Sequence, residues 1–79
     1  MTETSDDYDR VICCYDRYRI VRCSADIQFI VQRRGGGKKK RPWAAIAYVY
    51  DKEVMPRVLQ RRHLSIPQEL INAWEAADV

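Results

Sequence analysis

A short basic segment rich in glycine, lying between two runs of β-forming residues, constrains the fold of this chain more than any other feature. Residues 33–41 read Arg-Arg-Gly-Gly-Gly-Lys-Lys-Lys-Arg, so six cations flank three glycines. Residues 27–32 before it and residues 43–50 after it are rich in β-branched and aromatic side chains. A flexible connection between two such runs is typical of a hairpin with a long loop. The sequence therefore predicts two antiparallel strands joined by a cationic loop.

Residues 18–23 predict a third strand, and residues 24–26 predict a turn after it. Successive side chains of a strand point to opposite faces of the sheet. In residues 27–32 this alternation separates two sets, which are Ile27, Phe29 and Val31 on one face and Gln28, Ile30 and Gln32 on the other. In residues 43–50 the two sets are Trp43, Ala45, Ala47 and Val49 against Ala44, Ile46, Tyr48 and Tyr50.

After these strands the apolar residues recur at helical spacing, in Val54, Met55, Val58 and Leu59. Proline is tolerated only in the first turn of a helix, so Pro56 predicts that this helix begins near Met55. A second helix is predicted to open with Ser65 as its cap and Pro67 in its first turn. Its apolar stripe is Leu70, Ile71, Trp74 and Ala77. The predicted fold class is α+β, with a small three-stranded antiparallel sheet followed by two helices.

A chain of 79 residues is long enough for one domain, and a domain of this size buries only about 60% of its unfolded surface. We expect residues 1–10 to be a polar, flexible N-terminus and residues 11–79 to form a single α+β domain. The predicted core consists of Ile20, Val21, Ile27, Phe29, Val31, Trp43, Ile46, Val49, Val58, Leu59, Leu70, Ile71 and Trp74. Because so small a core leaves little stability, a homodimer that buries further apolar surface is another expectation.

Charge is distributed unevenly along the chain. The net charge is +3, yet residues 1–9 sum to −4, residues 33–63 to +8 and residues 64–79 to −3. Such contrast indicates either a charged partner or ordinary surface solvation. The acidic N-terminus either imitates phosphates before a basic protein surface or is simply a polar chain end. The sequence has no apolar run near the roughly 20 residues of a membrane helix and no basic signal-peptide start. With an odd number of cysteines, three, these features predict a cytoplasmic protein with reduced thiols.

No set of residues meets the requirements of catalysis or of a metal site. His63 is the one histidine, and no carboxylate nearby in sequence would orient it as a general base. Cys13, Cys14 and Cys23 lie in expected β segments without an activating base. Their spacing also differs from the paired cysteines of zinc sites. We therefore expect a protein that is not an enzyme and that has no cofactor and no metal.

The basic segment is the main candidate for a binding site. Phosphates bind Lys and Arg and bases stack on aromatic rings, and Trp43 follows the cations closely. Arg57 and Arg61 lie one helical turn apart and are expected to extend the same surface. The alternative is that the cations only keep a hairpin tip soluble and that Trp43 belongs to the core. The candidate partner-binding residues are Arg33, Arg34, Lys38, Lys39, Lys40, Arg41, Trp43, Arg57 and Arg61.

Four short motifs stand in order along residues 18–62, namely Tyr18-Arg19-Ile20-Val21, Asp26-Ile27-Gln28-Phe29-Ile30-Val31-Gln32-Arg33-Arg34, Arg41-Pro42-Trp43 and Val58-Leu59. In these motifs the chain resembles a group of small proteins from phages and mobile elements of alphaproteobacteria. Some proteins of this size and genomic kind are anti-CRISPR proteins, including class 1, type I inhibitors directed at multi-subunit surveillance complexes. The resemblance implies a small phage protein of that kind. The glycine and lysine run at residues 35–40 and the acidic N-terminus depart from the pattern.

Three functions follow as hypotheses. The first is an anti-CRISPR-like inhibitor that binds a host CRISPR effector complex, through its protein or its guide RNA, and blocks target-DNA binding by occupancy. The second is a small nucleic-acid-binding regulator from a mobile element, which uses the same basic loop directly on DNA or RNA. The third is a non-catalytic protein-docking module, whose contact face is the apolar side of the sheet around Ile30, Ile46 and Tyr48.

Overall fold

A four-stranded antiparallel sheet and two α-helices make up the chain in a computed structural model that describes residues 3–35 and 42–77. Along the chain the elements are β1 (Val11–Tyr15), β2 (Tyr18–Arg22), β3 (Phe29–Arg34), β4 (Trp43–Val49), α1 (Met55–Leu59), the 3-10 helix η1 (Arg62–Leu64) and α2 (Gln68–Ala76). The strands lie side by side in the order β1-β2-β3-β4. The predicted α+β class, antiparallel sheet and two helices are confirmed, and the number of strands is corrected from three to four.

The additional strand is β1, whose sequence lacks a clear alternation of polar and apolar residues. It pairs with β2 through a tight turn in which Asp16 has a φ of 54°. Asp is one of the few residues besides Gly that adopts this left-handed conformation readily. The strand is therefore defined by pairing and by its turn, which single-strand periodicity does not detect.

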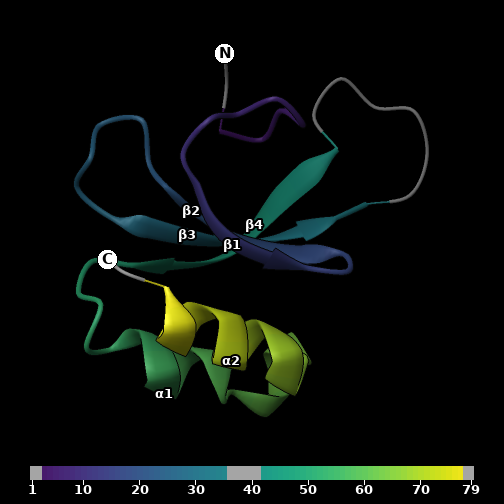
Figure 1. Cartoon of the computed structure of the whole chain (residues 1–79), viewed down its shortest axis with the longest axis vertical. Helices are drawn as coiled ribbons and strands as arrows, with labels where there is room; N and C mark the ends of the chain where they lie inside the picture. The colour runs from purple at the N-terminus through teal and green to yellow at the C-terminus, as the bar shows by residue number, and fades with distance from the viewer. Residues whose placement is uncertain (1–2, 36–41, 78–79) are drawn as a thin grey trace.

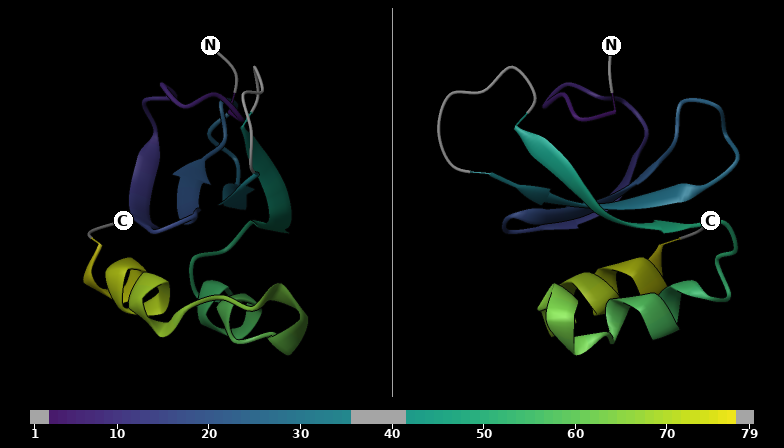
Figure 2. Two further views of the ribbon diagram at one scale, coloured as in Figure 1. Left: turned by 90° about the vertical axis from the view of Figure 1, so that its right-hand side faces the viewer. Right: turned by 180° about the vertical axis from the view of Figure 1, so that it is seen from behind.

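The sheet is covered on both faces. Both helices lie against one face, and the chain before β1 crosses the other (Figure 1, Figure 2). We call these the helix face and the strap face, and we call residues 3–8 the N-terminal strap. Tyr8 at its end is only 7% exposed, so the expectation of a flexible terminus does not describe residues 3–8.

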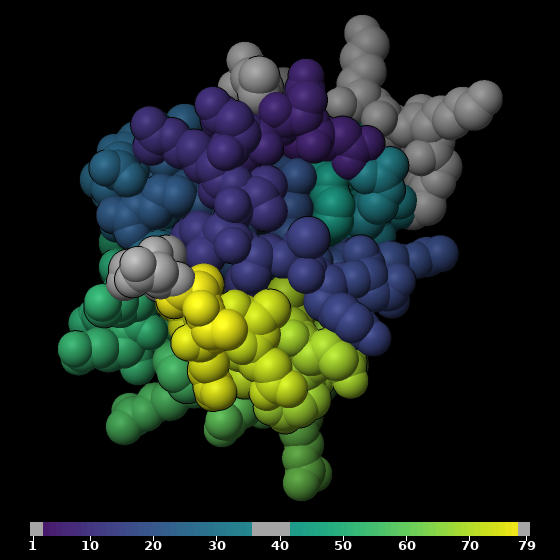
Figure 3. Space-filling view, in the orientation of Figure 1, coloured from purple at the N-terminus to yellow at the C-terminus, as the bar shows by residue number. Residues whose placement is uncertain are grey.

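The main core lies between the sheet and the helices. Phe29 and Trp74 meet edge to face there, with ring centroids 5.1 Å apart, and α2 packs along β1 (Figure 3). The buried residues of this main core are Ile20, Phe29, Val31, Val49, Met55, Val58, Leu59, Leu70, Ile71 and Trp74. A smaller cluster on the strap face consists of Tyr8, Val21, Cys23 and Ile30. The core prediction is wrong for Ile27, which is 59% exposed, and Ile46 is only partly buried.

A bulge in β4 changes which of its side chains share a face. Val31 pairs with Ala47 and Gln32 pairs with Ala45, so Ile46 is the extra residue between them. Ala47 and Ile46 consequently pack on the helix-face core, whereas Ala45 packs on the strap-face cluster. The predicted alternation, which put Ala45 and Ala47 on one face, is therefore wrong beyond the bulge.

The helices begin where proline permits. The prediction that the first helix begins near Met55 is confirmed, with Pro56 in its first turn. The predicted cap of the second helix is wrong, because Ser65 ends η1 with a φ of 53° and α2 begins after Pro67 without a side-chain cap. Among residues 3–35 and 42–77, no helix combines the length and hydropathy needed to cross a membrane.

Candidate functional site

Three arginines lie together at one end of the sheet. Arg17 is in the β1–β2 turn, and Arg33 and Arg34 are the last residues of β3. The N–H of Arg34 donates to the carbonyl of Arg17 at 2.7 Å, and that of Gly35 donates to the carbonyl of Pro42 at 2.8 Å. These bonds bring the turn and the strand ends together. We call this place, with its three arginines, the basic end.

The charges at the basic end are compensated unequally. Arg17 and Arg33 are exposed and form no ion pair with any residue in the described ranges. The Arg33 guanidinium lies 5.9 Å from the centroid of the Tyr18 ring. Arg34 instead forms an ion pair with Asp6 of the N-terminal strap. Two cations are thus available to a ligand, and the third already has a partner.

Asp6 receives two donors on the same oxygen. Its Oδ1 accepts hydrogen bonds from the Arg34 guanidinium and from the indole Nε1–H of Trp43, the latter at 2.8 Å. These two hydrogen bonds, that of Arg34 first, hold the pKa of the Asp6 carboxyl below its usual value. The ion pair remains accessible to water, with side-chain exposures of 40% for Arg34 and 55% for Asp6.

Trp43 is buried under the N-terminal strap and is only 8% exposed. The backbone N–H of Trp43 donates to the carbonyl of Thr4 at 3.2 Å, and the Arg19 guanidinium lies 4.2 Å from the centroid of the Trp43 ring. Of the two expectations for Trp43, burial in the core is confirmed, and exposure beside the cations for base stacking is wrong. The ring is covered because the strap crosses the start of β4.

Arg19 is the most deeply buried cation, at 3% exposure. Its Nε donates to Oε1 of Gln32 at 2.6 Å, and its Nη2 donates to the carbonyls of Glu3 and Ser5 at 3.0 and 2.9 Å. Gln32 Nε2 donates to the same Glu3 carbonyl at 2.8 Å. Burial lowers the pKa of the Arg19 guanidinium. These bonds fasten the N-terminal strap to the middle of the sheet.

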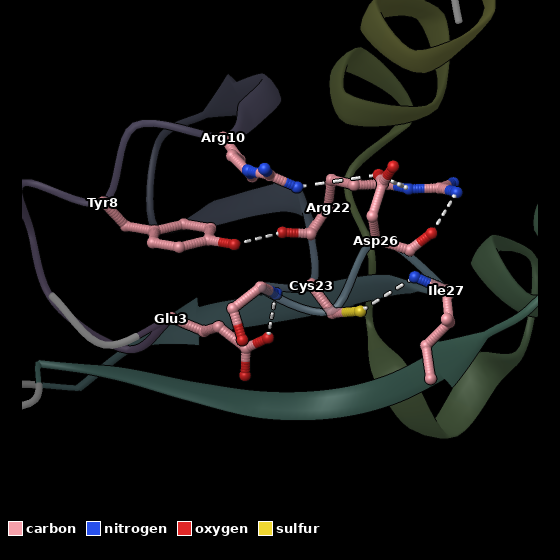
Figure 4. Close-up of polar contacts among 8 residues, drawn as sticks. Glu3, Tyr8, Arg10, Arg22, Cys23, Asp26 and Ile27 are labelled. Carbon is pink, nitrogen blue, oxygen red and sulfur yellow. Dashed lines mark hydrogen bonds and ion pairs between the residues drawn. The ribbon is translucent and has the colours of Figure 1, made fainter.

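The N-terminal strap is also held at the end of the sheet opposite the basic end (Figure 4). The Tyr8 hydroxyl donates to the carbonyl of Arg22 at 2.5 Å, and Glu3 Oε2 accepts the N–H of Ser24 at 2.6 Å. Asp26 pairs there with Arg22 at 2.8 Å and, more loosely, with Arg10 at 3.6 Å. The N-terminal strap therefore spans the sheet, and Asp6 connects it to Arg34 of the basic end.

Two surface hollows flank β4. The one at the basic end has a volume of about 240 Å³ and includes Arg17, Arg33 and Ile46 in its wall. The other, of about 350 Å³, lies between β4 and the helix layer and includes Ile46, Arg61 and His63. Since Ile46 belongs to both, Arg61 lies along the same flank as Arg33. Arg57 is exposed on α1 but lines neither hollow.

The remaining predicted cations, Lys38, Lys39, Lys40 and Arg41, lie outside the described residues. Sequence reasoning missed Arg17, Arg19 and Asp6. For Arg19 a signal existed, because it is a charged residue inside a β-forming run and another polar residue, Gln32, lies inside the next run. For Asp6 only the negative charge of the N-terminus was visible, since its partner Trp43 is 37 residues away along the chain.

All three cysteines have free thiols. Cys14 is exposed, whereas burial and the neighbouring Cys14 thiol raise the pKa of Cys13 to about 11. Burial works to raise the pKa of Cys23, but backbone N–H groups, that of Ile27 at 3.3 Å first among them, hold it below its usual value (Figure 4). Within the described ranges, no group of three or more His, Cys, Asp or Glu side chains is placed to hold a metal ion.

We found no match for this chain among protein-family models, curated proteins or solved structures.

Proposed function

We propose that this chain is a non-catalytic binding protein that attaches through its basic end to an anionic assembly containing nucleic acid. One observation carries the proposal: Arg17 and Arg33 are exposed beside each other without an ion pair in the described residues. The sequence adds four further cations at residues 38–41, directly after this place. Clustered cations attract polyanions over a distance, and they bind phosphates by releasing condensed counterions.

Within this class we propose an anti-CRISPR-like inhibitor that acts in the cytoplasm of a host cell. It binds a class 1 CRISPR effector complex and blocks target DNA by occupancy, without chemical turnover. Such a complex contains guide RNA, so a basic surface has phosphates to bind. The resemblance of residues 18–62 to small phage and mobile-element proteins supports this class.

The test is inhibition of target-DNA binding by a purified type I effector complex, read in a gel-shift assay. Arg17→Glu/Arg33→Glu is expected to abolish inhibition, and so is replacement of Lys38, Lys39 and Lys40 together by Glu. Arg62→Glu is the control, because Arg62 is exposed on η1 and lines neither hollow. Far-UV circular dichroism checks that each variant is folded. Normal inhibition by the double variant, or no inhibition by the wild type, refutes the proposal.

Direct binding of nucleic acid by a mobile-element regulator is the second candidate, because the same two exposed arginines favour it. The two functions separate in one measurement. A regulator binds bare DNA or RNA near physiological ionic strength, and each phosphate-binding cation removed lowers the salt slope by about 0.7 to 0.9. An inhibitor binds the effector complex more tightly than its isolated nucleic acid.

A protein-docking module is supported only by the hollow beside β4. Tyr48 and Ile46 line it, and Tyr48 is 61% exposed. Ile30, the third residue expected on such a face, is 2% exposed under the N-terminal strap. Neutral effects of every substitution at the basic end, with loss of binding in Tyr48→Glu, would favour this function. Sedimentation equilibrium of the purified protein tests the expected homodimer.

A further inference from the structure

Two donors from neighbouring strands converge on a single point at the basic end. The Arg34 guanidinium of β3 and the indole Nε1–H of Trp43 of β4 both donate to Oδ1 of Asp6. That oxygen belongs to a side chain that is 55% exposed. A charged fork and a fixed N–H aimed at one oxygen are the arrangement that binds oxyanions, including phosphates.

The Trp43 donor is held in place without Asp6. The Trp43 ring lies against the guanidinium of Arg19, 4.2 Å from its centroid, and the backbone of Trp43 is bonded to Thr4. Arg19 in turn is held by Gln32 and by two strap carbonyls. If the Asp6 side chain rotates away, the indole N–H of Trp43 therefore stays in place, and the Arg34 guanidinium still has the Trp43 ring beside it, 5.7 Å from its centroid. A ligand then meets one donor that is already ordered.

We propose that this point is a phosphate-binding site for the backbone of a nucleic acid and that Asp6 occupies it as an internal substitute for phosphate. The proposal rests on the proposed function and assigns to it a third cation, Arg34, and one neutral donor, Trp43. A bound phosphate displaces the Asp6 carboxylate, because two anions cannot share the two donors. Arg17 and Arg33 lie at the same end of the sheet, but Arg33 points to the helix face, with its guanidinium 5.9 Å from the centroid of the Tyr18 ring, so the site itself consists of Arg34 and Trp43.

A single-stranded nucleic acid fits this geometry better than an isolated anion. Its phosphates repeat along one strand, and the basic end offers three arginines on two adjoining segments, the β1–β2 turn and the end of β3. Asp6 lowers the affinity in the unliganded protein, because its carboxylate competes with the ligand from within the same molecule. Removing it is therefore expected to increase affinity by more than the change in net charge explains.

The experiment compares Asp6→Ala with Asp9→Ala. Both variants remove one negative charge from the N-terminal region, but Asp9 is exposed and pairs with no cation in the described residues. The probe is a fluorescein-labelled single-stranded DNA of twelve nucleotides, and anisotropy gives its Kd over a range of salt concentrations. Asp6→Ala is expected to tighten binding about tenfold and Asp9→Ala about twofold or less. The salt slope of Asp6→Ala is expected to steepen by up to about 0.7, because one more phosphate is neutralised without expelling a carboxylate.

A second measurement reports on the site itself. In ¹H–¹⁵N spectra of Asp6→Ala, the oligonucleotide is expected to shift the indole N–H resonance of Trp43 and to leave that of Trp74, which is buried in the helix-face core, unchanged. Trp43→Phe, added to Asp6→Ala, is expected to remove several-fold of the gained affinity. Circular dichroism and thermal unfolding show whether the N-terminal strap and sheet remain folded in each variant.

The outcomes separate this inference from the proposed function. Equal tightening by Asp6→Ala and Asp9→Ala, or no shift of the Trp43 resonance, overturns the phosphate site, even if the wild type binds the probe. An acidic peptide of glutamates that shifts Trp43 as strongly as the oligonucleotide overturns the choice of nucleic acid. Binding by Asp6→Ala but not by the wild type supports the masked site and counts against the regulator that binds bare nucleic acid. Absence of binding by both proteins overturns the phosphate site, whereas the proposed function stands or falls with the inhibition assay.

Discussion

Replacement of Arg19 by Met tests whether the buried guanidinium holds the N-terminal strap on the sheet. Methionine has a similar length but no donors, so the variant loses the hydrogen bonds to Gln32, Glu3 and Ser5. It also loses the stacking of the cation on Trp43.

The loss of stability in Arg19→Met depends on which of the acceptors keep a hydrogen-bond donor. The Glu3 carbonyl still accepts from Gln32 Nε2, and the Ser5 carbonyl still accepts the N–H of Tyr8 at 3.3 Å. Oε1 of Gln32, a residue with 0% exposure, loses the Arg19 donor. One buried acceptor without a partner costs about 1–3 kcal/mol, and loss of the cation–π contact costs about 1 kcal/mol. Relief from burying a charge offsets part of this, so we expect a loss of about 2–3 kcal/mol.

Urea unfolding followed by circular dichroism measures this loss, and a constant slope against urea confirms that the same unfolding is compared. The matched control is Arg17→Met, which removes an exposed guanidinium two residues away and is expected to change stability by less than about 0.5 kcal/mol. Emission from Trp43 is expected to shift to longer wavelength in Arg19→Met as the strap loosens. A loss below about 0.5 kcal/mol, or a gain in stability, would show that the cost of burying the guanidinium equals or exceeds the energy of its contacts. Either result would refute the reasoning.

Four further expectations follow. The folded-state pKa of Asp6 lies below its ordinary value of 3.8, so the Arg34 ion pair stabilises the fold above pH 3.8 and is lost as the pH falls through the folded-state pKa. The urea midpoints of the wild type and Asp6→Asn should therefore converge in acid, and a constant gap between them would contradict the assignment. Cys14 should react with a thiol reagent at neutral pH much faster than Cys13, whose pKa is about 11, so that a fast phase surviving in Cys14→Ser would refute this. Ser65→Gly should raise stability by about 0.5 kcal/mol in thermal unfolding, because φ is 53° at this position. Leu70→Ala should cost about 2–5 kcal/mol, since Leu70 has 0% exposure; a loss below 1 kcal/mol would argue against this core.

Local patterns in the sequence were sufficient to predict the pairing of the two central strands and the start of the first helix. Residues 29–34 and 43–49 pair as the two β-forming runs predict, and Pro56 marks the start of α1. These features depend on side chains close together along the chain, which is what periodicity and turn chemistry report. The bulge at Ile46 lay beyond such reasoning, because an extra residue is visible only in the pairing of two strands.

The sequence was sufficient to predict most of the charged residues of the candidate site, but not which of them are paired and which side chains are covered. The sequence by itself determined that the chain is an α+β domain and that its cations are concentrated around the end of one hairpin. Only the tertiary structure decided that Arg17 joins them, that Arg34 is paired with Asp6 and that Trp43 is covered. The physical reason is that charge density is a local property of the chain, whereas the partner of a charge depends on which distant segments the packed sheet brings within hydrogen-bonding distance.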